Sequence, residues 1–234
     1  MQTINITIIR FANCLKTEEL ELFRGAIIEL ASMHDASLFH NHTDDGYRYG
    51  CPLIQYKILQ GRVALVGIGK GANELLWLRP YLNRELLIGH RELKFEVMSV
   101  ENIEAQIGVM SQTMRYQLKD WMPLNGKNDK LFHSTHDEGE RFMLLEDILT
   151  SSIVSFYRDM GYDPTERIRC RIERRGPIVK EQYKEVAMRT TDIEFRTNAL
   201  LPLYIGIGKG SSLGHGIVET AKNLKNKNRN LNPA

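Results

Sequence analysis

The sequence predicts an α+β fold of two tandem ferredoxin-like (RRM-like, βαββαβ) domains, the second less regular and ending in a glycine-rich loop. The first half shows strand and helix patterns in the order β-α-β-β-α-β, which defines that fold. The second half repeats the theme less cleanly, and the pentapeptide GIGKG occurs in both halves, at Gly67–Gly71 and Gly206–Gly210. We therefore expect domains over residues 1–102 and 103–222 and a disordered basic tail over 223–234.

Alternation of apolar residues and helical spacing define the elements of the first half. Gln60-Gly61 separates two of the strands by the two-residue connection of a hairpin. Thr17 is placed to cap the first helix, whose first turn is acidic. The predicted elements are a strand over Thr3–Phe11, a helix from Thr17 to about Leu30, strands over Leu53–Leu59 and Arg62–Ile68, a helix over about Ala72–Leu78 and a strand over Lys94–Val100.

The second half has one long helical pattern among strand patterns. Leu145, Leu149 and Phe156 lie on the inner side of this helix, and Gly161 ends it. The predicted elements are a strand over Thr113–Trp121, a connection over Met122–His136, a helix over about Glu140–Met160, strands around Ile168–Ile172, over Glu181–Met188 and over Asp192–Thr197, and a short strand around Ile217–Thr220.

Composition and charge limit the classes of function. The chain has 234 residues, of which 42% are hydrophobic, and a formal net charge of +2. A surface for a polyanion must therefore be a local basic face. The three cysteines are far apart and form no C-x-x-C pair, so neither a disulfide framework nor a zinc knuckle is indicated. The amino terminus has no signal-peptide pattern and no stretch approaches 18 apolar residues, which predicts a cytoplasmic protein with no membrane partner.

The glycine-rich loop has five glycines in the eleven residues from Gly206 to Gly216. Successive backbone N–H groups beside a lysine form a cradle for phosphate oxygens. A P-loop is excluded because Lys209 is followed by Gly210, and Ser211 stands where a dinucleotide fingerprint needs its third glycine. A polymeric phosphate backbone such as RNA remains open, and so does a turn with no ligand.

A polar segment after the first helix holds His40 and His42. Residues two apart in an extended segment point to the same side, and a histidine pair can supply a general base and a general acid without a metal. The nearby groups suited to positioning a phosphate or stabilising its charge are Tyr47, Arg48, Tyr49 and Lys57. Two alternatives stay open: ordinary polar loop residues, and a metal site completed by Asp44 and Asp45.

An arginine-rich strand provides the best electrostatic footprint for a nucleic acid. Its apolar residues alternate with arginines, so one face is basic, and arginine forks match phosphate geometry. The basic residues are Arg167, Arg169 and Arg171, with Arg174 and Arg175 beyond them. The alternative is an exposed sheet face whose arginines pair with Glu166, Glu173 and neighbouring acids.

Taken together, these features resemble the CRISPR-associated endoribonucleases of the RAMP superfamily that process CRISPR repeat transcripts. The resemblance covers nearly the whole chain. It rests on FRTN at Phe195–Asn198, Leu201-Pro202 and GIGKGSSLGHG at Gly206–Gly216, and on FHNH at Phe39–His42 and YRYGCPLIQYK at Tyr47–Lys57. Members of the family often carry a tyrosine in the first helix, and this helix has none.

The resemblance implies metal-independent cleavage of repeat RNA, in which the ribose 2′-OH attacks the adjacent phosphate and leaves a 2′,3′-cyclic phosphate. It makes His40 or His42 the catalytic histidine, Tyr47 or Tyr49 its helper and Lys57 the charge stabiliser. The RNA-binding residues would be Arg167, Arg169, Arg171, Arg174, Gly206, Gly208, Lys209, Gly214 and Gly216, of which the loop residues would contact RNA or shape the groove.

No cofactor and no metal is expected, and RNA is the expected partner. Other CRISPR effector proteins and a second copy of the chain are further candidate partners. Two other functions remain open: a non-catalytic RNA-binding subunit of a CRISPR ribonucleoprotein, and a ferredoxin-like module that binds a protein or a metabolite.

Overall fold

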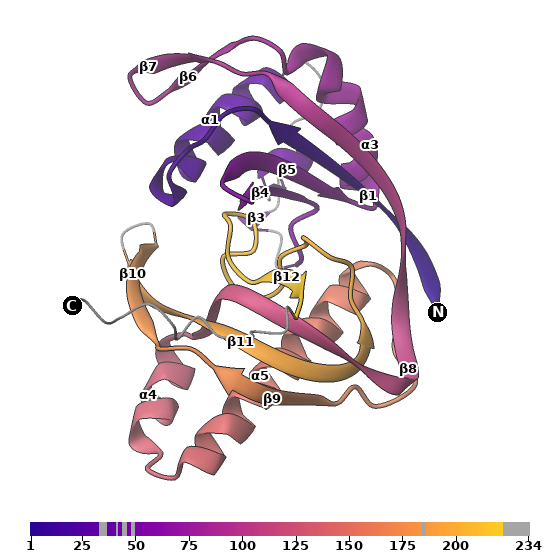
Figure 1. Ribbon diagram of the computed structural model, residues 1–234, viewed down its shortest axis with the longest axis vertical. Helices are drawn as coiled ribbons and strands as arrows, with labels where there is room; N and C mark the ends of the chain where they lie inside the picture. The colour runs from indigo at the N-terminus through magenta and orange to yellow at the C-terminus, as the bar shows by residue number, and fades with distance from the viewer. Residues whose placement is uncertain (33–36, 41, 44–45, 48–49, 184–185, 222–234) are drawn as a thin grey trace, which may run out of the picture.

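The computed structural model consists of two halves joined by one long strand (Figure 1). It describes residues 1–32, 37–40, 42–43, 46–47, 50–183 and 186–221. For residues 40, 42–43, 46–47, 181–183 and 186–187 it describes the backbone alone. The predicted tail over 223–234 lies outside the described residues. Within them, no helix is both long enough and apolar enough to cross a membrane.

The first half contains the predicted strands and helices in the predicted order. Its antiparallel sheet has the strand order β8-β1-β5-β4. The strands and helices that build it are β1 (Gln2–Phe11), α1 (Leu20–Ala31), β4 (Ile54–Leu59), β5 (Arg62–Ile68), α3 (Lys70–Leu78) and the first part of β8 (Val97–Leu124). Short elements lie between them: η1 (Thr17–Glu19), α2 (Ser37–His40), β2 (His42–Thr43), β3 (Gly46–Tyr47), η2 (Arg79–Tyr81), β6 (Glu85–Ile88) and β7 (Arg91–Lys94).

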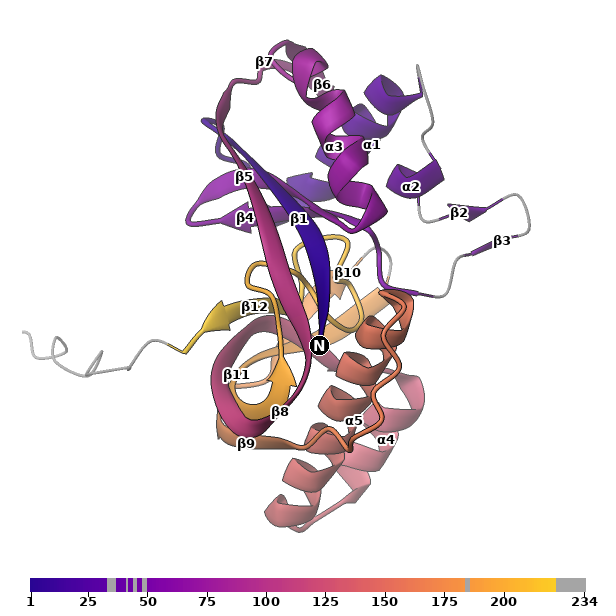
Figure 2. The same ribbon diagram turned by 90° about the vertical axis from the view of Figure 1, so that its right-hand side faces the viewer.

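In the sheet of the first half, β1, β4 and β5 are mostly buried on both faces, whereas the first part of β8 is largely exposed. Ile9 and Phe11 of β1 belong to a hydrophobic cluster that also contains the apolar residues of α1 and α3. Ile6 and Ile8 point to the other face and belong to a second cluster, which the second half completes. Figure 2 shows α1 and α3 beside this sheet and the second half below it. The two halves therefore share a hydrophobic core, which fixes the position of one half relative to the other.

The strand β8 is 28 residues long and belongs to both halves. It pairs with β1 up to Ile107 and with β11 (Val186–Leu200) from Gly108 onward. The two strands predicted over Lys94–Val100 and Thr113–Trp121 are therefore parts of one continuous strand, except that Lys94 ends β7. Figure 1 shows β8 running down one side of the molecule from the first half into the second.

The second half is an antiparallel sheet packed against α5. Its strand order is β12-β8-β11-β9, and β10 pairs with the free part of β11. Asp137 caps α5 by accepting a hydrogen bond from the backbone N–H of Glu140 (2.8 Å). Its remaining elements are α4 (Gly126–Ser134), α5 (Glu138–Asp159), β9 (Cys170–Arg175), β10 (Val179–Tyr183) and β12 (Ile217–Thr220).

Two local predictions were wrong, and one hairpin was missed. The connection over Met122–His136 contains α4, whose only buried residue, Phe132, leaves almost no hydrophobic periodicity to recognise. Thr17 begins a 3-10 turn, and the α-helix starts at Leu20 with Glu19 at its N-cap, so Thr17 does not cap it. The hairpin β6–β7 was not predicted, because its four-residue strands are mostly exposed.

Candidate functional site

A cleft of about 750 Å³ opens between the two halves. Its walls are the glycine-rich loop (Gly206–Gly216), one face of α5, and residues 50–52, which lead from the histidine segment (residues 40–49) into β4. Most of its lining side chains are small or polar, among them Asp147, Ser151, Ser152, Ser155, Asp159 and Lys209. An open, polar cleft of this kind suits a phosphate-bearing polymer better than an apolar small molecule.

The glycine-rich loop folds back on itself and presents one short stretch to the cleft. Gly208 and Lys209 are exposed and line the cleft, whereas Gly206, Gly214 and Gly216 are buried. A Cβ on Gly206 would lie 2.6 Å from the Lys57 ammonium and 2.8 Å and 2.9 Å from two carbonyl oxygens. The buried glycines therefore shape the loop, and the stretch Ile207–Ser212 lines the cleft, with Gly208 and Lys209 as its most exposed residues.

The strand β4 of the first half holds this loop of the second half. The amide of Gln55 bonds to both the N–H and the carbonyl of Gly206, at 2.7 Å and 3.1 Å. The backbone N–H of Tyr56 donates to Ser212 (2.8 Å), and the ammonium of Lys57 donates to the carbonyl of Ser211 (3.3 Å). Four hydrogen bonds thus fix the loop across the boundary between the halves.

Lys57 is completely buried beneath the loop. Burial removes its ammonium from water and lowers the pKa of Lys57 to about 7. The nearby Cys51 has a smaller effect, which raises this pKa. The residue was predicted as a charge stabiliser at the site of chemistry. The structure places it behind the loop, where it supports Ser211 and does not line the cleft.

The buried lysine gives folding a pH dependence that can be measured. The unfolded chain keeps Lys57 protonated up to about pH 10, whereas the folded protein loses this proton near pH 7. Because the unfolded state binds more protons between these values, the contribution of Lys57 to stability rises with pH through this window. We expect Lys57→Met to be more stable than the parent near pH 6 and to lose this advantage towards pH 10.

Urea unfolding at several pH values measures this trend, and Lys94→Met is the matched control. Lys94 is exposed and pairs with Glu96, so its substitution should give a stability difference that changes little over the same range. A stability difference for Lys57→Met that does not shrink as pH rises would contradict a depressed pKa.

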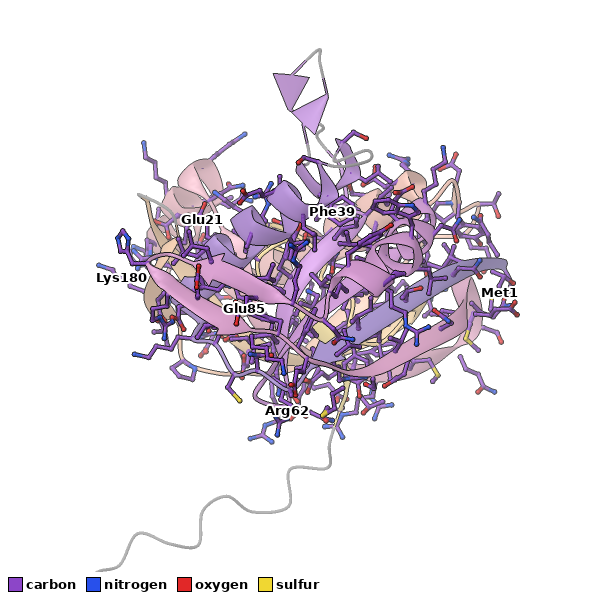
Figure 3. The ribbon with its side chains drawn as sticks, turned by 90° about the horizontal axis from the view of Figure 1, so that it is seen from above. Met1, Glu21, Phe39, Arg62, Glu85 and Lys180 are labelled. Carbon is purple, nitrogen blue, oxygen red and sulfur yellow. The ribbon has the colours of Figure 1, made fainter. Side chains whose placement is uncertain are left out.

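Residues 50–52 of the cleft wall directly follow the histidine segment along the chain. His40 ends α2, and His42 lies opposite Tyr47 in the pairing of β2 with β3. The side chains of these three residues lie outside the described part of the structure, as does Tyr49 entirely. Figure 3 shows the β2–β3 hairpin standing above the body of the molecule, close to the labelled Phe39.

Residues 50–52 tie this segment to α5. The backbone N–H of Cys51 donates to the Asp159 carboxylate (2.6 Å). A Cβ on Gly50 would lie 3.2 Å from that carboxylate, so residues 50–52 pass close to the end of α5. The contribution of Asp159 was missed, because no sequence pattern links a helix C-terminus to a loop 108 residues earlier.

The predicted basic face is present on β9 and the residues before it. Arg167, Arg169, Arg171 and Arg174 are exposed, while Ile168 and Ile172 are buried. Arg174 lies 3.8 Å from Glu194, and Glu173 pairs with Arg115 and Arg196. Among the described residues, Arg169 and Arg171 have no ion-pair partner, so the alternative of a fully neutralised face does not hold for these two.

His215, at the end of the loop, is buried. Its Nδ1 lies 3.2 Å from the carbonyl oxygen of Asp120, which can only accept a hydrogen bond, so Nδ1 carries the hydrogen. Burial lowers the pKa of His215, which keeps the imidazole neutral at neutral pH. The ring fills the space beside Gly210 and contributes to the shape of the loop.

Among the described residues, no group of three or more histidine, cysteine, aspartate or glutamate residues could hold an ion, but the metal alternative itself stays untested, because the side chains of His40 and His42 were not among them. Asp44 and Asp45, which that alternative needed, lie outside the described residues.

Comparison with protein families gives two matches that together span the chain. The model of the Cas6b N-terminal domain matches residues 2–106, and that of the Cas6b C-terminal domain matches residues 108–221. An uncharacterized protein of Methanocaldococcus jannaschii is 32% identical over 143 residues, which cover 57% of this chain and 95% of that protein.

Solved structures give the same family. A crystal structure of Cas6b has a TM-score of 0.80 at 28% identity and covers 94% of this chain and 100% of its own. A second, described as the CRISPR RNA processing endoribonuclease Cas6b, has a TM-score of 0.71 at 25% identity and covers 93% and 98%. A type IV Cas6 crRNA endonuclease, Csf5, shares the fold, with a TM-score of 0.60 at 13% identity over 94% of this chain and 100% of its own.

Proposed function

The chain belongs to the Cas6b family, and from this premise we propose that it is an endoribonuclease that cleaves CRISPR repeat RNA without a metal. The observation that carries the proposal is the cleft, because the glycine-rich loop forms one of its walls and the residues that follow the histidine segment form another. One wall presents Gly208 and Lys209 of the glycine-rich loop, and residues 50–52 connect another wall to the histidine segment.

The reaction we propose is an internal phosphoryl transfer. A base from the histidine segment removes the proton of the ribose 2′-OH, and the 2′-oxygen forms a bond to the adjacent phosphorus. The bond from phosphorus to the 5′-oxygen breaks, and an acid protonates that oxygen. The products are a 2′,3′-cyclic phosphate and a 5′-OH. His40 and His42 are the candidates for base and acid, and Tyr47 or Tyr49 for a helper.

The loop would stabilise the charge that develops on the phosphate. Lys209 is exposed beside Gly208, where it can approach a phosphate in the cleft. Lys57 lies behind the same loop, so we assign it support of the loop in place of the direct charge stabilisation first predicted.

The basic face around Arg169 and Arg171 would hold the rest of the RNA. Both guanidinium groups are exposed and unpaired among the described residues, so a phosphate backbone can displace water and counterions from them. Other CRISPR effector proteins and a second copy of the chain remain candidate partners, and the cytoplasm the candidate compartment.

We further infer that the two halves are two ferredoxin-like domains. The strand orders β8-β1-β5-β4 and β12-β8-β11-β9 are equivalent if β8 serves as last strand of the first domain and first strand of the second. The glycine-rich loop then occupies the place of the second helix in the second domain. The boundary would lie within β8, near residue 103 as first predicted or a few residues later, at Gly108.

Incubation of the protein with CRISPR repeat RNA in EDTA tests the proposed function. We expect one cut with a 2′,3′-cyclic phosphate end, at a rate unchanged by the chelator. Unrelated RNA of equal length is the control. A cut that needs added metal would contradict the mechanism, and tight, salt-sensitive binding of repeat RNA without a cut would favour the non-catalytic subunit.

A further inference from the structure

Gln55 lies in β4 with its side chain completely buried. Its Oε1 accepts a hydrogen bond from the backbone N–H of Gly206 (2.7 Å). Its Nε2 donates to the carbonyl oxygens of Gly206 (3.1 Å) and Pro52 (3.2 Å). One side-chain amide is thereby bonded to backbone groups of two separate segments.

These two segments belong to two neighbouring walls of the cleft, the glycine-rich loop and residues 50–52. Gly206 begins the glycine-rich loop of the second half, and Pro52 belongs to residues 50–52, which follow the histidine segment of the first half. Asp159 of α5 bonds to Cys51, and Lys57 of β4 bonds to Ser211. Gln55 bonds both to the glycine-rich loop and to residues 50–52.

The chemistry of these bonds requires an amide. Gln55 uses one acceptor and two donor hydrogens, and a glutamine side chain supplies both on one planar group. A carboxylate of the same length has no donor, and methionine, which has a similar shape, has neither. Neither an ionised glutamate nor a methionine therefore keeps both segments bonded.

We propose that Gln55 is a positioning residue, which sets the distance between the glycine-rich loop and the histidine segment so that both address the same phosphate. This inference rests on the proposed function. Cleavage needs the acid–base groups and the charge-stabilising loop to be in register, and a displacement of about 1 Å can lower a rate by about 100-fold. Loss of the Gln55 bonds would release one wall from the other without removing any group that touches RNA.

Single-turnover cleavage of saturating repeat RNA separates positioning from simple stabilisation. For Gln55→Met we expect the rate constant to fall by at least about 10-fold, while the fraction of enzyme that cleaves and the RNA dissociation constant stay close to those of the parent. Gln106→Met is the matched control, because Gln106 is an exposed residue of β8 whose side chain, among the described residues, bonds only to Thr3, and its rate constant should be unchanged.

Gln55→Glu gives a second readout. A buried glutamate has a raised pKa, and its protonated form recovers one donor and one acceptor. The rate constant of this variant, divided by that of the parent at the same pH, should therefore rise as the pH is lowered. A role limited to stability predicts no such recovery.

The inference is overturned if Gln55→Met cleaves at the parental rate, or if only the active fraction falls and the rate constant is kept, since Gln55 would then merely stabilise the fold. If the parent protein itself binds repeat RNA but does not cut it, the proposed function fails and the inference fails with it. The parental reaction, run beside each variant, distinguishes the two failures.

Discussion

Replacing His40 and His42 together by alanine is expected to abolish cleavage of repeat RNA while leaving its binding close to that of the parent. Removing one general acid or base costs about 100-fold to 10,000-fold in rate, and removing both leaves no titrating group near neutral pH in this segment. Single-turnover cleavage measures the loss, and filter binding measures the affinity. Each single variant then identifies which histidine is essential.

His133→Ala is the matched control for this double variant. His133 lies on α4, pairs with Asp129 at 3.5 Å and does not line the cleft, so its loss should leave the rate unchanged. Full activity in the double variant would remove the histidine segment from the mechanism. An equal loss of RNA affinity and of rate would instead make the segment a binding element.

The family and most of the fold were predictable because the signals that carry them are local. Alternation in Thr3–Phe11, the Gln60-Gly61 turn and the stop at Gly161 each act over a few residues, and β1, the β4–β5 hairpin and α5 were confirmed. Both Gln60 and Gly61 have positive φ angles, as a tight hairpin turn requires. The resemblance to CRISPR RNA processing endonucleases, which rested on short strings in both halves, was confirmed at the level of the family.

The arrangement of the site was less predictable because it depends on contacts between distant residues. Gln55 and Gly206 are 151 residues apart, and nothing in either local pattern indicates that they bond. Lys57 was expected to be accessible, because Tyr56 before it is buried and successive residues of a strand point to opposite faces. The glycine-rich loop, whose Ser211 accepts a hydrogen bond from Lys57, covers this second face of β4. The roles predicted for His40, His42, Tyr47 and Tyr49 stay predictions, since their side chains lie outside the described residues.

Gly216→Ala is expected to cost the protein roughly 3 kcal/mol or more of folding free energy, because two independent penalties coincide. Gly216 has φ = +63°, a conformation that an L side chain adopts only at a cost. A Cβ at this position would also overlap the carbonyl oxygen of Ile207, which the loop cannot move freely, because the N–H of Ile207 donates to the carbonyl of Gly216 (3.0 Å). Urea unfolding measures the loss.

Two other glycines separate these penalties. Gly161→Ala meets strain alone, since its φ is +77° and no atom lies within 4 Å of the added Cβ, so it should cost about 1 kcal/mol. Gly126→Ala, at the start of α4 in open space with no positive φ, should be neutral or slightly stabilising. If Gly216→Ala cost no more than Gly161→Ala, the loop could yield at Ile207. The loop would then be flexible and would adapt to bound RNA. A larger loss of folding free energy for Gly216→Ala would instead show that the loop is rigid, so that the histidine segment must be positioned relative to it.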